Sequence, residues 1–278
     1  MRVLILGATG LLGKALMGEW TGADVVGLGS RDVDIRDAGR VRGVVGDAQA
    51  DWIVLAAAYT DVDGCETNRE LAFAINRDGA LNVATAAKQA GARLLFLSSD
   101  YVFDGKKTTP YETDDVRNPQ SVYGRSKSEA ETGLLETLPG CCIARTSWLF
   151  GTGGKCFPDT ILKLAASRPA LDVVNDQRGG PTYCVDLARA IIELCHKDAS
   201  GIVHVTNSGD CSWFEFAQAI VKRAGLGTEV RPVSSLQMAR PAPRPAYSVL
   251  SATSLRHYGI QMPTWQGALR RYLDERKR

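Results

Sequence analysis

The stretch ILGATGLLGKAL, residues 5–16, places three glycines between an apolar run and a segment with helical character. Gly7, Gly10 and Gly13 give the spacing G-x-x-G-x-x-G, whereas the more familiar dinucleotide fingerprint is G-x-G-x-x-G. Glycine permits a tight turn and a close backbone approach, and the start of the next helix offers free N–H groups to a pyrophosphate. Because such glycines can also be purely structural, the nucleotide interpretation depends on the segments that follow.

Apolar runs of a strand's length recur along the first half of the chain, with helical segments between them. Near-continuous apolar runs are typical of strands buried on both faces of a parallel sheet. The segment 68–91 has apolar positions at helical spacing and ends at a glycine. The alternation predicts an α/β fold with a doubly wound, Rossmann-like parallel sheet. The predicted strands lie in residues 2–7, 24–29, 51–58, 92–99 and 141–148.

The second half of the chain is less regular. From about residue 150 it contains the loops FGTGGK (150–155) and NDQRGGPT (175–182), and it is rich in helical segments from residue 212. We therefore expect a dinucleotide-binding domain at residues 1–148 and a smaller C-terminal domain, mainly substrate-binding, at 149–278. Elements within residues 171–200 are expected to return to the first domain.

Composition excludes several classes of protein. The 278 residues are 45% hydrophobic with a net charge of +2, and the basic run RRYLDERKR (270–278) is typical of a charged helix end, so a nucleic-acid partner is not expected. Seven cysteines without a C-x-x-C, and three histidines that do not cluster with them, argue against structural zinc and a disulfide framework. Without an apolar run of 18 residues or a leader pattern, the sequence favours a cytoplasmic protein with no membrane partner.

The residues after the second predicted strand bear on the choice of cofactor. An acidic residue usually stands there in NAD sites, but GLGSRDVDIRD (27–37) has Gly29, Ser30 and Arg31 at that point. Arginine suits the 2′-phosphate of NADPH because it is permanently charged and forks onto phosphate oxygens. Arg31 could equally be a surface residue paired with Asp32 or Asp34. NADPH is favoured, and NADH remains the alternative.

The pentapeptide YGRSK (123–127) supplies a candidate catalytic pair. On a helix, Tyr123 and Lys127 at positions i and i+4 share one face. Ser98 and Ser99 end the predicted strand 92–99, at the edge where ligands bind in open α/β sheets. A tyrosine needs its pKa lowered from about 10 to transfer protons near neutral pH, and a neighbouring ammonium could do this. A solvated helix face is the alternative for the pair.

With these residues the sequence resembles the extended short-chain dehydrogenase/reductases, and within them the dTDP-4-dehydrorhamnose reductase family. The resemblance runs in order over nearly the whole chain. Ser99 stands where many members have threonine and keeps the hydroxyl, whereas the short region around Gly29 leaves cofactor choice open. The matching stretches are GATGLLG, DWIVLAAAYTDVDGCE, NRDGALNVA, LSSDYVFDG, PYETDD, NPQSVYGRSKSEAE, RTSWLFG, NDQRGGPT and RPAPRPAYSVLS.

The resemblance implies roles for particular residues. Tyr123 would give a proton to a ketone oxygen as hydride arrives from nicotinamide, Lys127 would hold the nicotinamide ribose and lower the tyrosine pKa, and Ser99 would hydrogen-bond the carbonyl. The implied cofactor-binding residues are Gly7, Thr9, Gly10, Leu11, Leu12, Gly13, Arg31, Asp34, Ile35, Ala56, Ala57, Ala58, Tyr59, Ser98, Tyr123 and Lys127. The implied substrate-binding residues are Thr60, Val62, Ser99, Asp100, Tyr101, Trp148, Gln177 and Arg244.

Some of these assignments have an equally simple structural alternative. Trp148 could be a core aromatic at a strand end. Asn76 could brace the active-site backbone, or it could serve as a cap or in packing. Arg244 is preferred over Arg240 as a ligand of the substrate diphosphate, with a surface role as the alternative.

The expected activity is NADPH-dependent reduction of the 4-keto group of a nucleotide-activated deoxysugar. The resemblance points to conversion of dTDP-4-dehydro-L-rhamnose to dTDP-L-rhamnose for cell-wall polysaccharide. Another NDP-sugar epimerase or reductase is the first alternative. The second is a non-catalytic regulatory subunit related to the methionine adenosyltransferase beta subunit, which the presence of Tyr123, Lys127 and Ser99 disfavours. No metal site is predicted, and a homodimer is one assembly open to such a chain.

Overall fold

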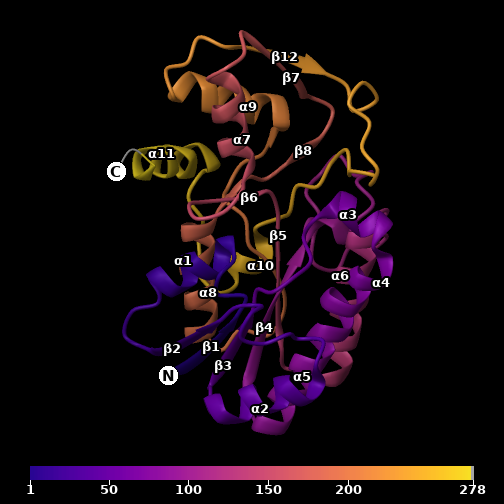
Figure 1. The fold of residues 1–278 in the computed structure, drawn as a ribbon, viewed down its shortest axis with the longest axis vertical. Helices are drawn as coiled ribbons and strands as arrows, with labels where there is room; N and C mark the ends of the chain where they lie inside the picture. The colour runs from indigo at the N-terminus through magenta and orange to yellow at the C-terminus, as the bar shows by residue number, and fades with distance from the viewer. Residues whose placement is uncertain (277–278) are drawn as a thin grey trace.

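Six parallel strands form the central sheet of a large lobe (Figure 1). The structure is a computed structural model that describes residues 1–276; positions 277–278 of the basic run lie outside the described residues. All five predicted strands are confirmed, and a sixth, β10, joins their edge. In spatial order the strands are β10 (Gly201–His204), β5 (Cys142–Thr146), β4 (Arg93–Ser99), β3 (Trp52–Leu55), β1 (Arg2–Leu6) and β2 (Asp24–Leu28).

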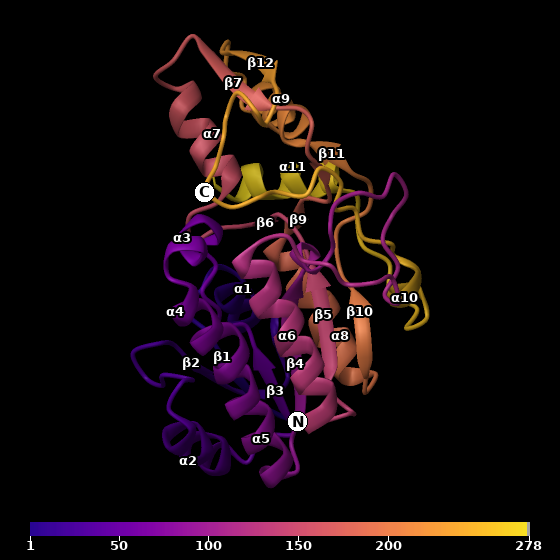
Figure 2. The same ribbon diagram turned by 90° about the vertical axis from the view of Figure 1, so that its right-hand side faces the viewer.

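Helices cover both faces of this sheet, which explains why its central strands are apolar on both sides (Figures 1 and 2). One face packs against α1 (Leu11–Glu19) and α8 (Cys184–His196). The other packs against α2 (Ala38–Ala48), α5 (Ala80–Ala90) and α6 (Val122–Thr137). Residues 1–276 contain no helix with the length and apolar character needed to cross a bilayer.

The strand order reverses beside β1. The chain leaves β1 for β2 on one side and then returns to β3 on the other, so the connections after β1 and β3 diverge to opposite faces of the sheet. Such a switch point leaves a crevice at the carboxyl ends of the two strands, which is where ligands bind in open α/β sheets. The glycine turn after β1 and residues 56–58 after β3 lie at this crevice.

A smaller lobe sits above the carboxyl edge of the sheet (Figure 2). Its core is built by α7 (Phe157–Ala165), α9 (Trp213–Arg223) and α11 (Trp265–Glu275). Its strands form short two-stranded pairs: β6 (Leu149–Phe150) with β9 (Thr182–Tyr183), β7 (Ala170–Val174) with β12 (Glu229–Val233), and β8 (Arg178–Gly179) with β11 (Cys211–Ser212).

The residues expected to return to the large lobe divide between the two lobes. Helix α8 packs on α1, and β10, just beyond residue 200, pairs with β5. Strand β7 does not return, because it pairs in parallel with β12 of the small lobe. The short helix α10 (Thr253–Arg256) lies beside β10, so the chain enters the large lobe once more before ending in α11.

The predicted helix at residues 68–91 is interrupted. It consists of α4 (Arg69–Phe73), a π-helical turn η1 (Ala74–Gly79) and α5, and it follows the short helix α3 (Val62–Thr67). In the π turn, Asn76 is buried and binds the backbone N–H and C=O of Tyr59 and the hydroxyl of Ser126. Because π-helical turns are frequent at functional sites, this interruption points to the residues around Tyr59 and Ser126 as part of a functional site.

A buried ion pair fixes α6 against the sheet. Glu131 of α6 and Arg145 of β5 are 0% and 1% exposed, and two hydrogen bonds of 2.9 and 2.7 Å join them. Ser98 of β4 donates to the same carboxylate, and Arg117 approaches it at 3.3 Å. Two parallel N–H···O bonds of this kind fix the orientation of both side chains.

We expect Glu131→Gln to lower the free energy of unfolding by about 3 kcal/mol or more, because it leaves Arg145 charged and uncompensated in the interior. Urea denaturation would measure this loss. The matched control is Glu129→Gln, since Glu129 pairs with Arg77 at the surface and its removal should change stability by less than about 1 kcal/mol. Equal effects of the two substitutions would contradict a structural role for the buried pair.

Candidate active site

The turn after β1 and the first turn of α1 each have one position that accepts only glycine. Gly7 has φ +97°, and a Cβ there would lie 2.5 Å from the backbone nitrogen of Ala57. A Cβ on Gly13 would lie 2.1 Å from the carbonyl oxygen of Gly7. The turn is therefore packed closely against the end of β3, and the backbone of the helix start lines the switch-point crevice.

The first turn of α6 is held next to the end of β4. Ser121 caps the helix by accepting from the N–H of Gly124 at 3.1 Å, and Glu66 accepts from the N–H of Val122 at 2.8 Å. A Cβ on Gly124 would lie 2.2 Å from the carbonyl oxygen of Tyr101. This close approach places Tyr123 beside the turn that follows β4.

Tyr123, Lys127 and Ser99 meet in one cavity of about 430 Å³, which we call the central cavity. The rings of Tyr123 and Tyr101 meet edge to face with centroids 5.5 Å apart, and the Lys127 ammonium lies 4.0 Å from the centroid of Phe96. Other residues that line the cavity are Gly7, Gly10, Leu11, Leu12, Gly13, Ala56, Ala58, Thr60, Val62, Ser98, Asp100, Ser147, Trp148 and Lys155.

Burial shifts the pKa values of the two titratable side chains Tyr123 and Lys127 in the central cavity. It raises the pKa of Tyr123 well above the ordinary value, so the phenol keeps its proton at neutral pH. It lowers the pKa of Lys127 to about 7. The neighbouring Ser99 hydroxyl acts against burial and lowers the pKa of Tyr123. Burial disfavours the charge of Lys127 itself.

Arg31, the predicted ligand of the 2′-phosphate, does not line the cavity that follows β2. A cavity of about 260 Å³, the strand-2 cavity, is lined by Gly29, Ser30, Asp34, Ile35 and Arg36, and it shares Gly7 and Ala58 with the central cavity. Arg36 binds the Asp34 carboxylate at 2.9 and 2.5 Å, which lowers the pKa of Asp34. Arg31 is exposed and is not among the lining residues. Arg36, five residues further along the same run, was missed.

A third cavity of about 390 Å³ opens in the small lobe. Phe157 and Trp213 start the helices α7 and α9 at its wall, and Gln177 and Arg244 also line it. Tyr101 lines both this small-lobe cavity and the central cavity, so the two adjoin. No local pattern singles out Phe157 and Trp213, because aromatic residues at helix starts usually belong to a core.

Trp148 lies at the junction of the lobes. It is half-buried, lines the central cavity and stacks on Trp213 with ring centroids 3.5 Å apart. Its φ of +48° is uncommon for a residue with a side chain, and such backbone strain concentrates at functional sites. Trp148 thus lines the central cavity and at the same time packs on a helix of the small lobe.

Arg244 is held by a partner that sequence reasoning missed. Its two terminal nitrogens donate to Asp63 at 2.7 and 3.0 Å, and Nη1 also donates to the carbonyl of Ala242. Asp63 belongs to α3 of the large lobe, so this pair joins the lobes across 181 positions of sequence. Arg240, at 63% side-chain exposure, approaches the same carboxylate only to 3.7 Å.

Most of the predicted site residues line one of the three cavities, and three do not. Ala57 lines the strand-2 cavity, and the others are named above. Thr9 packs on Gly29, Tyr59 packs in a cluster with Cys65 and Tyr123, and Arg31 is exposed. Among residues 1–276, no three His, Cys, Asp or Glu side chains are grouped to hold a metal ion.

A glycine-rich turn at the switch point of a parallel sheet, beside a helix that carries Tyr-x-x-x-Lys, defines a short-chain dehydrogenase/reductase type of protein. The family model described as RmlD substrate binding domain matches residues 1–278. The chain belongs to the dTDP-4-dehydrorhamnose reductase family.

Individual relatives cover nearly the whole chain. The spore coat polysaccharide biosynthesis protein SpsK of Bacillus subtilis is 43% identical over 277 residues, covering 99% of this chain and 98% of that protein. The dTDP-4-dehydrorhamnose reductase of Mycobacterium tuberculosis is 40% identical over 280 residues, covering 95% and 91%. The crystal structure of dTDP-4-dehydrorhamnose reductase from Bacillus anthracis in complex with NADP superposes with a TM-score of 0.96 at 40% identity, covering 99% of both chains.

Proposed function

We propose that this chain is an NADPH-dependent oxidoreductase that reduces the 4-keto group of dTDP-4-dehydro-L-rhamnose to give dTDP-L-rhamnose. The observation that carries the proposal is the meeting of Tyr123, Lys127 and Ser99 in a buried cavity with a further cavity on either side. The family membership and the names of the relatives support the substrate class.

The residues of the large lobe fit a dinucleotide. The glycines let the turn pack closely on the end of β3, and the start of α1 lines the crevice, where its free backbone N–H groups would meet a pyrophosphate. The strand-2 cavity would take the adenosine end, with Asp34 and Arg36 near its ribose. When bound, NADPH supplies the hydride, and Lys127 would hold its nicotinamide ribose.

Ser99 and Tyr123 would act on the ketone oxygen. That oxygen has two lone pairs, and the Ser99 and Tyr123 hydroxyls would each donate a hydrogen bond to one of them. As the carbonyl carbon takes up hydride, the oxygen gains negative charge and receives the proton of Tyr123. The raised pKa of Tyr123 keeps that proton in place until the charge develops.

The small-lobe cavity would bind the nucleotide half of the substrate. Phe157 and Trp213 offer flat faces to the base. Arg244 has five N–H groups, of which Asp63 and Ala242 use three. Within the described residues, its Nε–H and one Nη2–H are uncommitted, and we propose that this edge binds a phosphate oxygen pair.

The experiment that tests the function is NADPH oxidation with a panel of dTDP-, UDP- and GDP-4-keto sugars. Turnover of dTDP-4-dehydro-L-rhamnose in preference to the others supports the proposal, and turnover of another keto sugar would assign a different reductase. No turnover with the whole panel would favour the regulatory-subunit alternative. We place the reaction in the cytoplasm, because cysteines 65, 141, 142, 156, 184, 195 and 211 are all free and buried.

We expect Tyr123→Phe to slow hydride transfer by about 10²–10⁴-fold, because it removes the proton donor and keeps the ring. Single-turnover absorbance of NADPH would measure the rate, and fluorescence titration should show unchanged NADPH affinity. Tyr258→Phe, a remote change whose lost bonds are to the backbone of Ser200, is the matched control. A Tyr123→Phe enzyme that keeps a tenth of the wild-type rate would refute the assignment.

Arg36→Ala should weaken NADPH more than NADH and shift the preference ratio by about ten- to a hundred-fold, since a charged hydrogen bond contributes about 1.5–3 kcal/mol. The loss of affinity should be larger for NADPH because, without Arg36, the negative charge of Asp34 would face the 2′-phosphate uncompensated. Arg31→Ala is the control, and its ratio should change by less than about three-fold. A larger shift for Arg31→Ala would return the phosphate contact to Arg31.

Arg244→Ala should raise the Kd for dTDP at least about ten-fold and also reduce kcat, because binding energy from the nucleotide helps to orient the ketone. Calorimetry with dTDP would measure the affinity. Arg240→Ala serves as the exposed control, and Asp63→Asn tests whether the loop position alone explains the loss. Unchanged dTDP affinity in Arg244→Ala would remove Arg244 from the nucleotide site.

A further inference from the structure

Asp100 is a buried carboxyl group to which the proposed reaction assigns no chemical step. It follows Ser99 in a short 3₁₀ turn, η2 (Asp100–Val102), and it is 1% exposed. Its Oδ1 accepts a hydrogen bond of 2.9 Å from the Ser99 hydroxyl. Its Oδ2 is buried without a hydrogen-bond partner among residues 1–276, although the carboxyl lines the central cavity.

The Ser99 hydroxyl has one proton and two lone pairs to distribute. Its oxygen accepts from the N–H of Tyr101 at 3.2 Å, and its proton is given to Asp100. A carboxylate can only accept, so while Asp100 is ionised the Ser99 proton is committed to it. Ser99 then has no proton left for the oxygen of a bound ketone.

We propose that Asp100 is a positioning residue for Ser99: as a neutral acid it donates to the Ser99 oxygen and directs the Ser99 proton at the substrate ketone, whereas as a carboxylate it withdraws that donor. In the neutral state, Ser99 accepts from Tyr101 and Asp100 and donates to the ketone, so all its bonding capacity is used. The inference rests on the proposed function. The proton that enters the product still comes from Tyr123, which regains one from solvent.

The surroundings of Asp100 favour the neutral acid more than water does. Burial raises the pKa of Asp100 to about 6, whereas the Ser248 and Ser99 hydroxyls and nearby backbone groups act to lower it. The titratable groups that interact with its charge are Tyr101 on its own turn and Tyr123 on α6, and both hold their protons more tightly because of it. Lys127 lines the same cavity, but no ion pair to Asp100 forms within residues 1–276.

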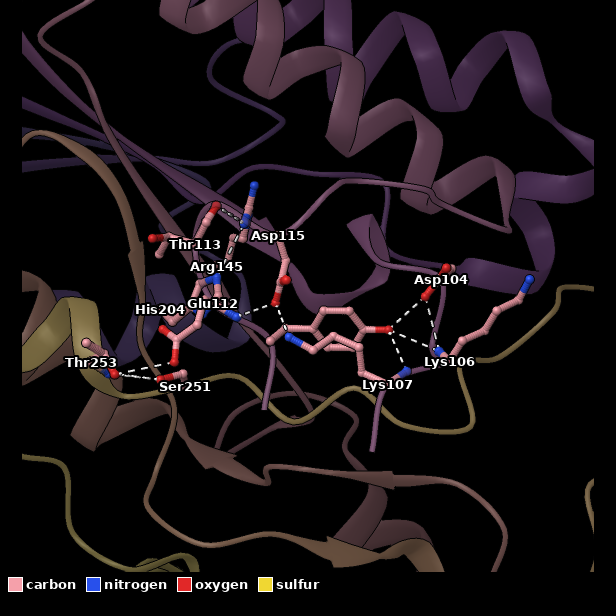
Figure 3. Close-up of polar contacts among 11 residues, drawn as sticks. Asp104, Lys106, Lys107, Glu112, Thr113, Asp115, Arg145, His204, Ser251 and Thr253 are labelled. Carbon is pink, nitrogen blue, oxygen red and sulfur yellow. Dashed lines mark hydrogen bonds and ion pairs between the residues drawn. The ribbon is translucent and has the colours of Figure 1, made fainter. Parts of the chain in front are cut away.

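Ser248 lowers the pKa of Asp100 and belongs to residues 246–254, a segment that we call the clasp. The N–H of Ser248 donates to Arg178 of β8, and the clasp exchanges two backbone hydrogen bonds of 2.8 Å with Tyr111. Figure 3 shows the neighbouring contacts: Thr253 of the clasp with Glu112, and Arg145 with Thr113. The group by which the clasp acts on the carboxyl is thus an uncharged hydroxyl.

The test is the pH dependence of single-turnover hydride transfer with saturating dTDP-4-dehydro-L-rhamnose. In wild type the rate should fall as the pH rises through the pKa of Asp100, because the neutral acid is the competent form. Asp100→Asn keeps the shape, does not titrate and offers an N–H to Ser99. Between about pH 6.5 and 8.5 the ratio of Asp100→Asn to wild-type rates should rise at least about ten-fold, and the titration of Lys127 cancels in that ratio.

Two further variants separate positioning from a structural effect. Ser99→Ala should abolish the effect of Asp100→Asn, so the double variant should follow Ser99→Ala at every pH. Ser248→Ala keeps Ser99 and Asp100 and removes a hydroxyl that lowers the pKa of Asp100. The pKa of Asp100 should therefore rise, and the fall in rate should move to higher pH. Thermal melting and NADPH titration would verify that each variant is folded.

The outcomes are distinct. Absence of NADPH oxidation by wild type at any pH would overturn the proposed function itself. Normal oxidation with the same pH dependence in wild type, Asp100→Asn and Ser248→Ala would overturn the role of Asp100 alone. An Asp100→Asn effect that persists in the Ser99→Ala background would also overturn it, because Asp100 would then act without Ser99.

Discussion

The bond between Glu131 and Arg145 is the constraint on which the catalytic edge depends. Tyr123, Lys127 and Glu131 are spaced by four residues along α6 and therefore share the face that meets the sheet. Pinning Glu131 to β5 and to Ser98 of β4 fixes both the rotation and the height of that helix. A buried pair is weak evidence for net stability, but its strict geometry determines where Tyr123 and Lys127 lie relative to Ser99.

Exclusion of water sets the protonation around this pair. Burial lowers the pKa of Lys127 to about 7 and of His204 to about 3, and it raises that of Asp100 to about 6. Neutral groups in such surroundings depend on the few hydrogen bonds that they make, because a dry interior strengthens each bond and penalises each missing one. A single hydroxyl such as that of Ser99 therefore influences whether its neighbours Asp100 and Tyr123 hold their protons.

The sequence was sufficient for features that follow from local pattern and failed for those set by tertiary contact. Apolar runs predicted five strands, but β10 has four residues at an edge and carries too little pattern. The π turn at Asn76 depends on bonds to Tyr59 and Ser126 from elsewhere in the chain. Likewise, which arginine after β2 faces the cavity depends on the path of the loop, and no local signal links Asp63 to Arg244.

The turn that follows β4 connects the central cavity with the small-lobe cavity. Successive residues of a tight turn point in different directions, so Ser99 and Asp100 face the central cavity while Tyr101 also lines the small-lobe cavity. The carbonyl of Tyr101 packs on Gly124 of α6, its N–H binds Ser99, and its ring meets that of Tyr123. In the proposed reaction, a nucleotide that displaces Tyr101 would therefore also move the Ser99 and Tyr123 hydroxyls, and this would couple the remote half of the substrate to the reacting groups.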